Sequence, residues 1–191
     1  FHAFADEHVQ KQESFDFRGT EPAAPAIITE YGIKFRADPA GAHKTGFFAD
    51  QRENRQWLSQ QCAGKRVLDL CCNTGGFGVY AAARGASEVV GIDIDEAVIE
   101  IAKANAKLNM PFENGARLRF VQADIFPWLR DAANNGELFD VVILDPAKMT
   151  RDREQVIPAL KKYLDMNKLA MGVVKPGGLF ATFSCTGLVS E

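Results

Sequence analysis

A glycine-containing turn and an acidic residue stand at a spacing that is typical of nucleoside-binding sites. The turn CNTGG follows the apolar run 66–71, and Asp93 ends the run EVVGID, 17 residues after Gly76. Small residues let the backbone approach a ligand closely, and a helix N-terminus behind them offers free amide groups. An acid at this offset can receive ribose hydroxyls. Because an acid that ends an apolar strand costs stability without a partner, we expect Asp93 to bind a ligand.

The glycine pattern also favours one nucleoside cofactor over another. NTGGFG lacks the GxGxxG arrangement that the pyrophosphate of a dinucleotide requires. S-adenosylmethionine carries no phosphate, so it fits this turn better than NAD does.

Two further residues that could do chemistry directly follow apolar runs. Asp145 follows FDVVIL, and Cys185 follows LFATFS. An isolated cysteine in a strand is usually a small buried hydrophobe. The position of Cys185 after the last strand favours a nucleophile instead.

The elements that must position these residues alternate regularly along the chain. Strand-like runs cover 66–71, 88–93, 117–122, 139–145 and 179–184, and helical segments cover about 77–85, 96–108, 126–134 and 154–175. This alternation predicts an α/β fold with a Rossmann-like, doubly wound and mainly parallel sheet. Ligands of such sheets lie beyond the carboxyl ends of the strands, where all the residues above are expected.

The segment before the sheet differs in character. Two β-like runs, AIITE and IKFRA, meet at Tyr31-Gly32 and predict a hairpin, and a helix is expected at about 50–62. We therefore expect a tail or linker at 1–25, a β-hairpin and loop at 26–49, and a catalytic domain at 50–191. Five Lys or Arg residues against three acids between residues 34 and 55 give this part a charge of +2.

Composition excludes several classes of protein. With 47% hydrophobic residues the chain is not mainly disordered, and a net charge of −3 argues against a free-standing, non-specific nucleic-acid binder, though not against an enzyme with a local basic patch. No apolar run approaches the roughly 20 residues that span a bilayer, so no membrane is expected as a partner. The four cysteines contain no CxxC pair, which excludes a zinc ribbon and leaves no metal expected. Their spacing fits a reducing compartment, hence a cytoplasmic location.

Four motifs carry a resemblance to a known family. VLDLCCNTGGFGVYAA resembles the first motif of class I S-adenosylmethionine-dependent methyltransferases, with Cys71 and Asn73 where many members have glycine. AHKTGFFADQREN, DPAK and FSCTGL, in this order, resemble the PUA-linked large-subunit rRNA 5-methylcytosine methyltransferases over residues 25–191. The class has a seven-stranded sheet, so the chain is expected to lack the last two strands. The chain does not begin with Met, and we expect a piece of a longer protein.

The resemblance implies a set of cofactor contacts. Asp93 would take the ribose hydroxyls, Ile94 would lie against adenine, and Asp124 would accept a hydrogen bond from the adenine amino group. Asp124 could equally be the N-cap of the next helix, and Asp95 is expected to be only a cap. The methionine pocket and its surroundings would be formed by Asp69, Asn73, Thr74, Gly75, Gly76, Phe77 and Gln51. Lys44 and Arg52 are the expected substrate contacts.

The resemblance also implies a reaction. Carbon 5 of a pyrimidine becomes nucleophilic when a thiolate adds to carbon 6, and Cys185 would supply that thiolate. Asp145 would hydrogen-bond the pyrimidine edge and handle a proton. The family usually reads DPPK where this chain has DPAK, and losing the second proline loosens the loop that would orient Lys148. Cys71 and Cys72 are expected to be pocket wall, and Cys62 to be packing.

The substrate would be RNA, expected to be large-subunit rRNA, with the target base single-stranded or flipped out. Phe47, Phe48 and Phe77 are candidate stacking surfaces, although each is more often core. A uracil carbon 5 methyltransferase, a guanine N-methyltransferase, a small-molecule methyltransferase and a cofactor-binding module without catalysis stay open as alternatives. So does a homodimer.

Overall fold

The computed structural model describes residues 25–38, 47–112, 115–150 and 153–185, and the chain divides into two compact units, 1–53 and 54–191. In the first unit, β1 (Ala26–Glu30) and β2 (Ile33–Ala37) pair antiparallel. Tyr31 and Gly32 between them both have positive φ, 48° and 85°. Two-residue turns of this kind match the twist of paired strands, and the predicted hairpin is confirmed.

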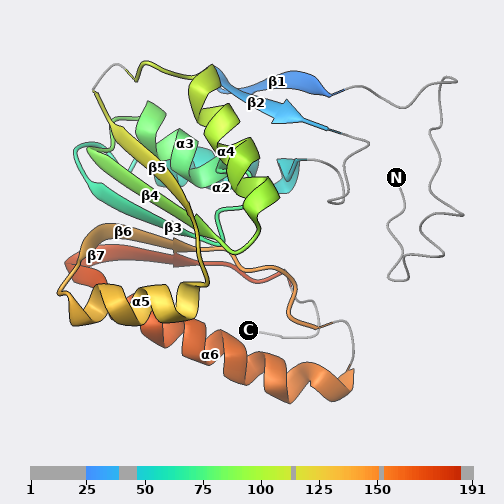
Figure 1. Cartoon of the computed structure of the whole chain (residues 1–191), viewed down its shortest axis with the longest axis vertical. Coiled ribbons are helices and arrows are strands. Elements are labelled where there is room, and N and C mark those ends of the chain that lie inside the picture. Colours follow the sequence, from blue (N-terminus) through green and yellow to red (C-terminus); the bar gives the residue numbers. More distant parts are fainter. Residues whose placement is uncertain (1–24, 39–46, 113–114, 151–152, 186–191) are drawn as a thin grey trace, which may run out of the picture. The chain divides into compact units, whose positions relative to one another are not determined.

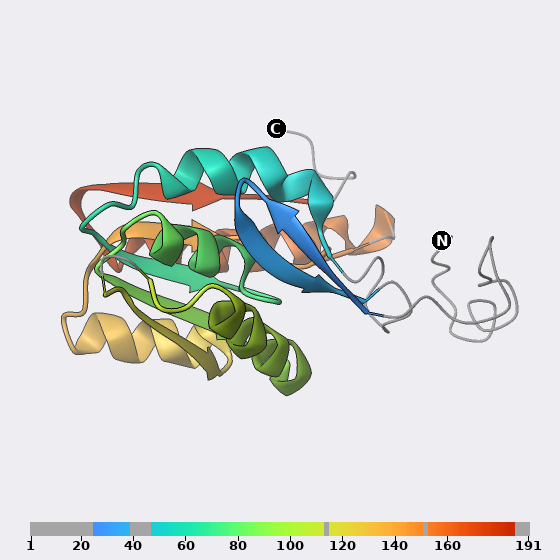
Figure 2. The ribbon, with the colours of Figure 1, turned by 90° about the horizontal axis from the view of Figure 1, so that it is seen from above.

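The second unit contains one parallel sheet in the order β5-β4-β3-β6-β7. Its strands are β3 (Arg66–Leu70), β4 (Glu88–Asp93), β5 (Arg117–Gln122), β6 (Phe139–Leu144) and β7 (Val174–Thr182). Every neighbouring pair is parallel, and the strand arrows point in one direction (Figure 2). The chain builds outward from β3 to β5 and then returns to β6, so the strand order reverses between β3 and β6. The predicted doubly wound fold is confirmed, and ligands of such sheets bind at this reversal.

Helices cover both faces of this sheet. They are α2 (Arg52–Ser59), α3 (Gly76–Ala83), α4 (Glu96–Leu108), α5 (Ile125–Asn134) and α6 (Val156–Met171), with short 3-10 turns at Ala49–Gln51 and Arg153–Gln155. Figure 1 shows α5 and α6 on one face and α3 and α4 on the other. In the described part of the chain, no helix is both long enough and apolar enough to span a membrane.

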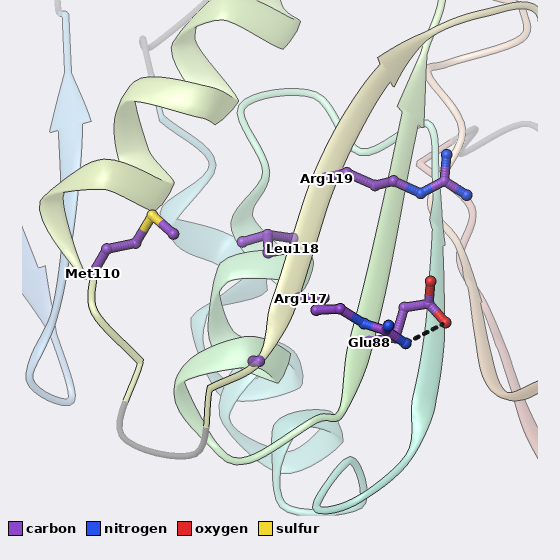
Figure 3. A pocket seen from close by; sticks show the side chains of 6 residues that line it. Glu88, Met110, Arg117, Leu118 and Arg119 are labelled. Atoms are coloured by element: carbon purple, nitrogen blue, oxygen red, sulfur yellow. Dashed lines mark ion pairs between the residues drawn. The ribbon is translucent and has the colours of Figure 1, made fainter.

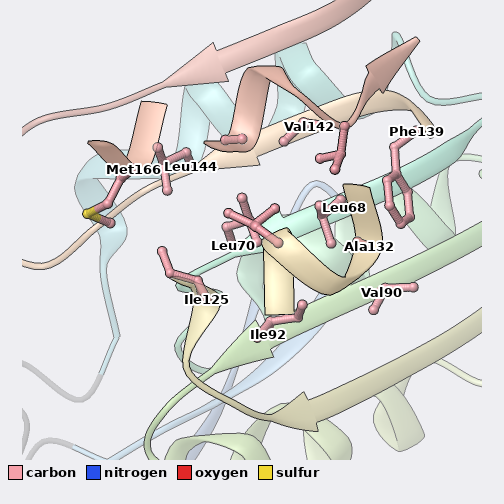
Figure 4. Packing of buried hydrophobic residues seen from close by; sticks show 13 residues of the cluster. Leu68, Leu70, Val90, Ile92, Ile125, Ala132, Phe139, Val142, Leu144 and Met166 are labelled. Carbon is pink, nitrogen blue, oxygen red and sulfur yellow. The ribbon is translucent and has the colours of Figure 1, made fainter. Parts of the chain in front are cut away.

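Two apolar clusters fill the spaces between the sheet and the helices. On one face, Leu68 and Leu70 pack with Ile125 of α5 and Met166 of α6 (Figure 4). On the other face, Val67 packs with side chains of α3. Successive residues of a strand point to opposite faces. Strands covered on both faces therefore read as continuous apolar runs, as β3 and β6 do.

The end of α6 differs from the prediction. The helix expected to reach residue 175 ends at Met171, with Gly172 as its C-cap, and Val174 already pairs with Phe139 in β7. Two consecutive β-branched residues, Val173 and Val174, favour a strand over a helix. The segment Pro176-Gly177-Gly178, expected to separate helix and strand, lies inside β7 instead. A strand at the edge of the sheet tolerates proline, and the pairing with β6 is irregular here.

Candidate functional site

The carboxyl ends of four strands bring the predicted residues to one edge of the sheet. Backbone hydrogen bonds continue the ladder there: the amide of Cys72 donates to the carbonyl of Ile92 at 2.9 Å, and that of Asp145 to Leu70 at 3.3 Å. The amide of Phe183 donates to Leu144 at 2.9 Å. The glycine turn, Asp93, Asp145 and Cys185 therefore meet at the edge where the sequence places them.

The turn after β3 has an unusual backbone. Cys71, Asn73 and Gly75 have φ values of 58°, 48° and 79°, all in the left-handed region. This region costs an ordinary side chain about 1–2 kcal/mol, less for asparagine, whose side chain bonds locally. Asn73 Oδ1 accepts a hydrogen bond from the amide of Thr74 at 2.6 Å. Cys71 and Asn73 thus keep the conformation that glycine has no difficulty in adopting.

Asp93 joins this turn to the end of β4. Its Oδ2 accepts a hydrogen bond from the amide of Asn73 at 2.9 Å, and its Oδ1 accepts one from the amide of Asp95 at 3.1 Å. These two amides are the partners that an acid at the end of an apolar strand needs. A carboxylate has about four acceptor positions, so Asp93 keeps capacity for ribose hydroxyls.

Asp69 lies under the turn without any exposed surface. Its Oδ2 accepts a hydrogen bond from the amide of Gly78, in the first turn of α3, at 2.8 Å. Among the described residues, its Oδ1 has no hydrogen-bond partner. Burial, with contributions from the nearby Asp145 and Asp93 and against the opposing hydrogen bond from the Gly78 amide, raises the pKa of this carboxyl from 3.8 to about 8. Asp69 thus fixes α3 beneath the predicted methionine pocket.

Phe120 of β5 explains why three positions around the turn are glycine. A Cβ atom at Gly75 or Gly91 would lie 2.6 Å or 2.4 Å from the Phe120 ring, and one at Gly78 would lie 3.3 Å from it. No real Cβ can approach so closely at the first two. The ring is buried, and it holds β4, the turn and α3 at a fixed spacing. Sequence reasoning missed Phe120, because within RLRFVQ it reads as an ordinary strand residue.

The structure describes only part of the predicted substrate-contact segment before β3. Lys44 lies outside the described residues. Gln51 and Arg52 belong to the first unit, where the guanidinium of Arg52 pairs with Glu53 at 3.0 Å and lies 5.5 Å from the ring centre of Tyr31. Their contacts with cofactor and substrate stay predictions.

Arg55, which sequence reasoning did not single out, is the basic residue found beside the turn. Only 3% of it is exposed, and a Cβ at Gly76 would lie 3.1 Å from its Cδ. Its guanidinium lies 5.9 Å from the ring centre of Tyr80 in α3. The sequence indicates only that Arg55 lies on one face of a helix. Which face is buried becomes known only from the structure.

The acids predicted as caps are caps. The Oδ1 atoms of Asp95 and Asp124 each accept a hydrogen bond at 2.8 Å, from the amides of Ala97 and Phe126 respectively. The role expected for Asp95 is confirmed. Asp124 is exposed, as is Ile94, and their contacts with adenine stay predictions.

The four cysteines fall into two groups. Burial raises the pKa of Cys62 to about 11, that of Cys71 to about 12 and that of Cys72 well above its ordinary value. These three thiols stay protonated at neutral pH, as packing and pocket wall require. Cys185 is exposed, and its Sγ lies 3.9 Å from the carbonyl oxygen of Pro146.

The surroundings of Cys185 come from two strand ends and a helix. Phe183 stacks on Phe77 of α3 with ring centres 5.4 Å apart, and the hydroxyl of Ser184 donates to the hydroxyl of Tyr163 at 3.3 Å. The segment DPAK lies alongside, with Asp145 half-buried and Lys148 exposed. Cys185 and the acid predicted to assist it are therefore neighbours, although 40 residues separate them in the sequence.

The aromatic residues considered as stacking surfaces are mostly core. Phe77 is buried, and its ring stacks on that of Phe183. Phe47 is buried against Phe35, with ring centres 5.1 Å apart. Phe48 is half-buried. Phe77 can thus shape the cofactor site only as part of its wall.

A shallow pocket lies at the opposite end of β4 and β5 (Figure 3). Glu88 and Arg117 face each other across it, 3.8 Å apart. None of the predicted site residues lines it, and the reactive groups lie at the other edge. Within the described ranges, no cluster of three or more His, Cys, Asp or Glu side chains could hold a metal ion.

Comparisons with known proteins agree with this geometry. A family model described as S-adenosylmethionine-dependent methyltransferase matches residues 2–186. The chain is 44% identical to ribosomal RNA large subunit methyltransferase I of Photobacterium profundum, covering 95% of this chain and 45% of that protein. It is 40% identical to the protein of the same name from Aeromonas salmonicida, covering 98% and 48%. The chain thus spans about half the length of the curated relatives it matches.

A solved structure extends the likeness to three dimensions. The crystal structure of SMU.776 in complex with S-adenosylhomocysteine (SAH) superimposes with a TM-score of 0.74 at 26% identity. The match covers 87% of this chain and 43% of that one.

Proposed function

This chain belongs to the S-adenosylmethionine-dependent methyltransferases, and on that premise we propose that it methylates carbon 5 of a cytosine in large-subunit ribosomal RNA through a thiolate adduct of Cys185. The observation that carries the proposal is the exposed thiol of Cys185 beside the carbonyl of Pro146 at the ligand edge. The names of the relatives support ribosomal RNA as the substrate.

The residues of the turn fit the cofactor. Gly75 and Gly76 let the turn pack directly against Phe120 and Arg55, and the buried Oδ1 of Asp69, which has no partner among the described residues, is a polar atom that the methionine part would satisfy. Asp93 would accept the ribose hydroxyls. When bound, S-adenosylmethionine supplies an electrophilic methyl group, which is the chemistry that a nucleophilic ring carbon needs.

The chain's own residues would then act in sequence. The Cys185 thiolate forms a bond with carbon 6 of the cytosine, which moves electron density to carbon 5 and makes it nucleophilic. Asp145 accepts a hydrogen bond from the pyrimidine edge and holds the ring in place. After carbon 5 has gained the methyl group, Asp145 or a water molecule removes the carbon 5 proton. The electron pair of that C–H bond restores the ring double bond and expels the thiolate.

A trapping experiment tests the proposal directly. RNA containing 5-fluorocytidine at the target position cannot lose a proton from carbon 5, so the Cys185–carbon 6 bond should persist. We expect a protein–RNA adduct, stable in denaturant and dependent on S-adenosylmethionine, with the wild-type chain. Cys185→Ala should give no adduct and lose at least about 10³-fold in methyl transfer to unmodified large-subunit rRNA, while binding SAH normally.

Cys62→Ala is the matched control, since Cys62 is buried packing remote from this edge, and it should form the adduct. Full-rate methylation by Cys185→Ala would overturn the thiolate step and indicate N-methylation of guanine. An adduct with 5-fluorouridine alone would indicate uracil. SAH binding without transfer to any RNA would leave only a cofactor-binding module.

Further parts of the proposal concern the whole protein. The resemblance of the motifs AHKTGFFADQREN, DPAK and FSCTGL supports a PUA-type domain elsewhere in the protein, and the ribosomal substrate in the names of the relatives supports a cytoplasmic location. A gel-shift comparison of this chain with a longer version should show tighter binding to ribosomal RNA by the longer one.

A further inference from the structure

A buried asparagine of α4 contacts the glycine-containing turn CNTGG after β3, called the cofactor turn below. Asn105 has no exposed surface, and its Nδ2 donates a hydrogen bond to the carbonyl oxygen of Thr74 at 2.9 Å. Asparagine is a poor helix former, and burying an amide is unfavourable unless its hydrogen bonds are made. An apolar residue would serve the helix better, so the amide group itself has a use here.

The hydrogen bond fixes one peptide plane within the turn. The carbonyl of Thr74 and the amide of Gly75 belong to the same planar peptide unit. Asn105 holds its carbonyl end, and the carbonyl of Cys72 accepts a hydrogen bond from its amide end at 2.8 Å. Two points of attachment prevent this plane from rotating.

Rotation of this peptide plane would disturb the conformation of the whole turn. Asn73 and Gly75 on either side of Thr74 both have left-handed φ values. A flip of the peptide between them would change the directions of the backbone groups that lead into α3. It would also release the Gly75 backbone from its present path beside Phe120.

We propose that Asn105 is a positioning residue that holds the cofactor turn in its binding conformation before the cofactor arrives. A turn that is already in the bound shape loses less conformational entropy on binding. Asn105 itself touches no reacting atom. The inference rests on the family's cofactor and is independent of which base is methylated.

Isothermal titration of the full chain with SAH, well below each melting temperature, tests this role. Asn105→Ala should weaken SAH binding about tenfold, the effect of losing one hydrogen bond that orders the turn. Asn105→Asp should weaken it at least as much, because a carboxylate cannot donate to Thr74 and repels its carbonyl. Lowering the pH should restore part of that loss relative to wild type, since a protonated carboxyl can donate again.

Asn109→Ala is the matched control. Asn109 is the C-cap of the same helix, and its Nδ2 donates to the backbone carbonyl of Asn105 at 2.8 Å. Its loss should lower stability and leave the Kd for SAH within about twofold. In the cofactor-free chain, hydrogen exchange over residues 72–78 should accelerate in Asn105→Ala and stay unchanged in Asn109→Ala.

Two results would overturn the proposal. One is a Kd within twofold of wild type in both Asn105 variants. The other is an equal effect of Asn109→Ala, which would indicate helix stability alone. If Asn105→Ala does not fold, Asn105→Leu, an apolar side chain of similar size that cannot donate, is measured with the same criteria. Because no RNA is present, a failed methylation assay leaves these results unaffected.

Discussion

At the scale of single residues, Asp69 has an environment that is unusual for an acid. Its carboxyl is fully buried, and its pKa is raised from 3.8 to about 8. Between these values the unfolded chain carries the charge and the folded chain keeps the proton. The folded state therefore binds more protons, and the free energy of unfolding must fall as the pH rises across this window.

Asp69→Asn should remove this pH dependence, because an amide does not ionise and still accepts the Gly78 hydrogen bond. The stability of wild type relative to the variant should fall between pH 5 and pH 8, by up to about 1.4 kcal/mol for each pH unit. Urea denaturation of both proteins at several pH values measures this difference. Parallel curves would show that Asp69 is ionised in the fold.

Sequence reasoning placed correctly the residues whose position in the fold follows from their position along a strand. Asp93, Asp145 and Cys185 stand at strand ends, and a parallel sheet brings strand ends together. It missed Arg55 and Asn105, because each acts on the turn through a contact between elements far apart in the chain. Nothing in the local pattern of α2 or α4 distinguishes them from other polar residues on a helix.

At the scale of elements, β4, α3 and the cofactor turn are spaced by one aromatic ring. The Cβ of an alanine at position 91 would lie 2.4 Å from Phe120 Cδ1 and 3.2 Å from Cys72 Sγ. The ring is buried and cannot swing into solvent. Position 91 therefore requires glycine, because any side chain there would collide with Phe120 of the neighbouring strand β5.

Gly91→Ala should destabilise the fold by about 1–3 kcal/mol, the usual cost of overpacking a core. Phe120→Leu leaves more room, so Gly91→Ala should cost less in that background. Urea denaturation of the wild type, both single variants and the double variant gives the coupling energy. Strict additivity would mean that β4 moves away from the ring instead of pressing against it.

Element boundaries were predictable where one signal dominated. The strands β4 and β5 have the predicted bounds, because each is an apolar or alternating run between polar turns. The end of α6 could not be predicted, because Val174 fits the apolar stripe of a helix and also begins β7. Only the partner strand β6 decides between these two readings.

At the scale of the whole molecule, α6 presents apolar side chains to solvent. Ile157, Leu160, Leu164 and Met171 are between 45% and 80% exposed. Their spacing of three, four and seven residues places them along one side of the helix. Exposed apolar stripes of this kind promote association between proteins.

We expect this chain to self-associate at high concentration, which would fit a homodimer. The double substitution Ile157→Lys with Leu164→Lys should weaken the association at least about tenfold, since two charges replace buried apolar contacts. Sedimentation equilibrium over a range of concentrations measures it. Leu108→Lys, at an exposed position of α4, is the control and should associate as wild type does. A monomer at all concentrations would contradict the expectation.

The place of Cys185 after β7, the last strand in the described part of the chain, has a consequence for biosynthesis. Chains fold from the N-terminus as they leave the ribosome. The turn, Asp93 and Asn105 are all translated before β6 and β7, so the predicted cofactor pocket can take shape while Cys185 is still inside the exit tunnel. On the proposed mechanism, the thiol then reaches a cofactor site whose strands and helices have already been synthesised.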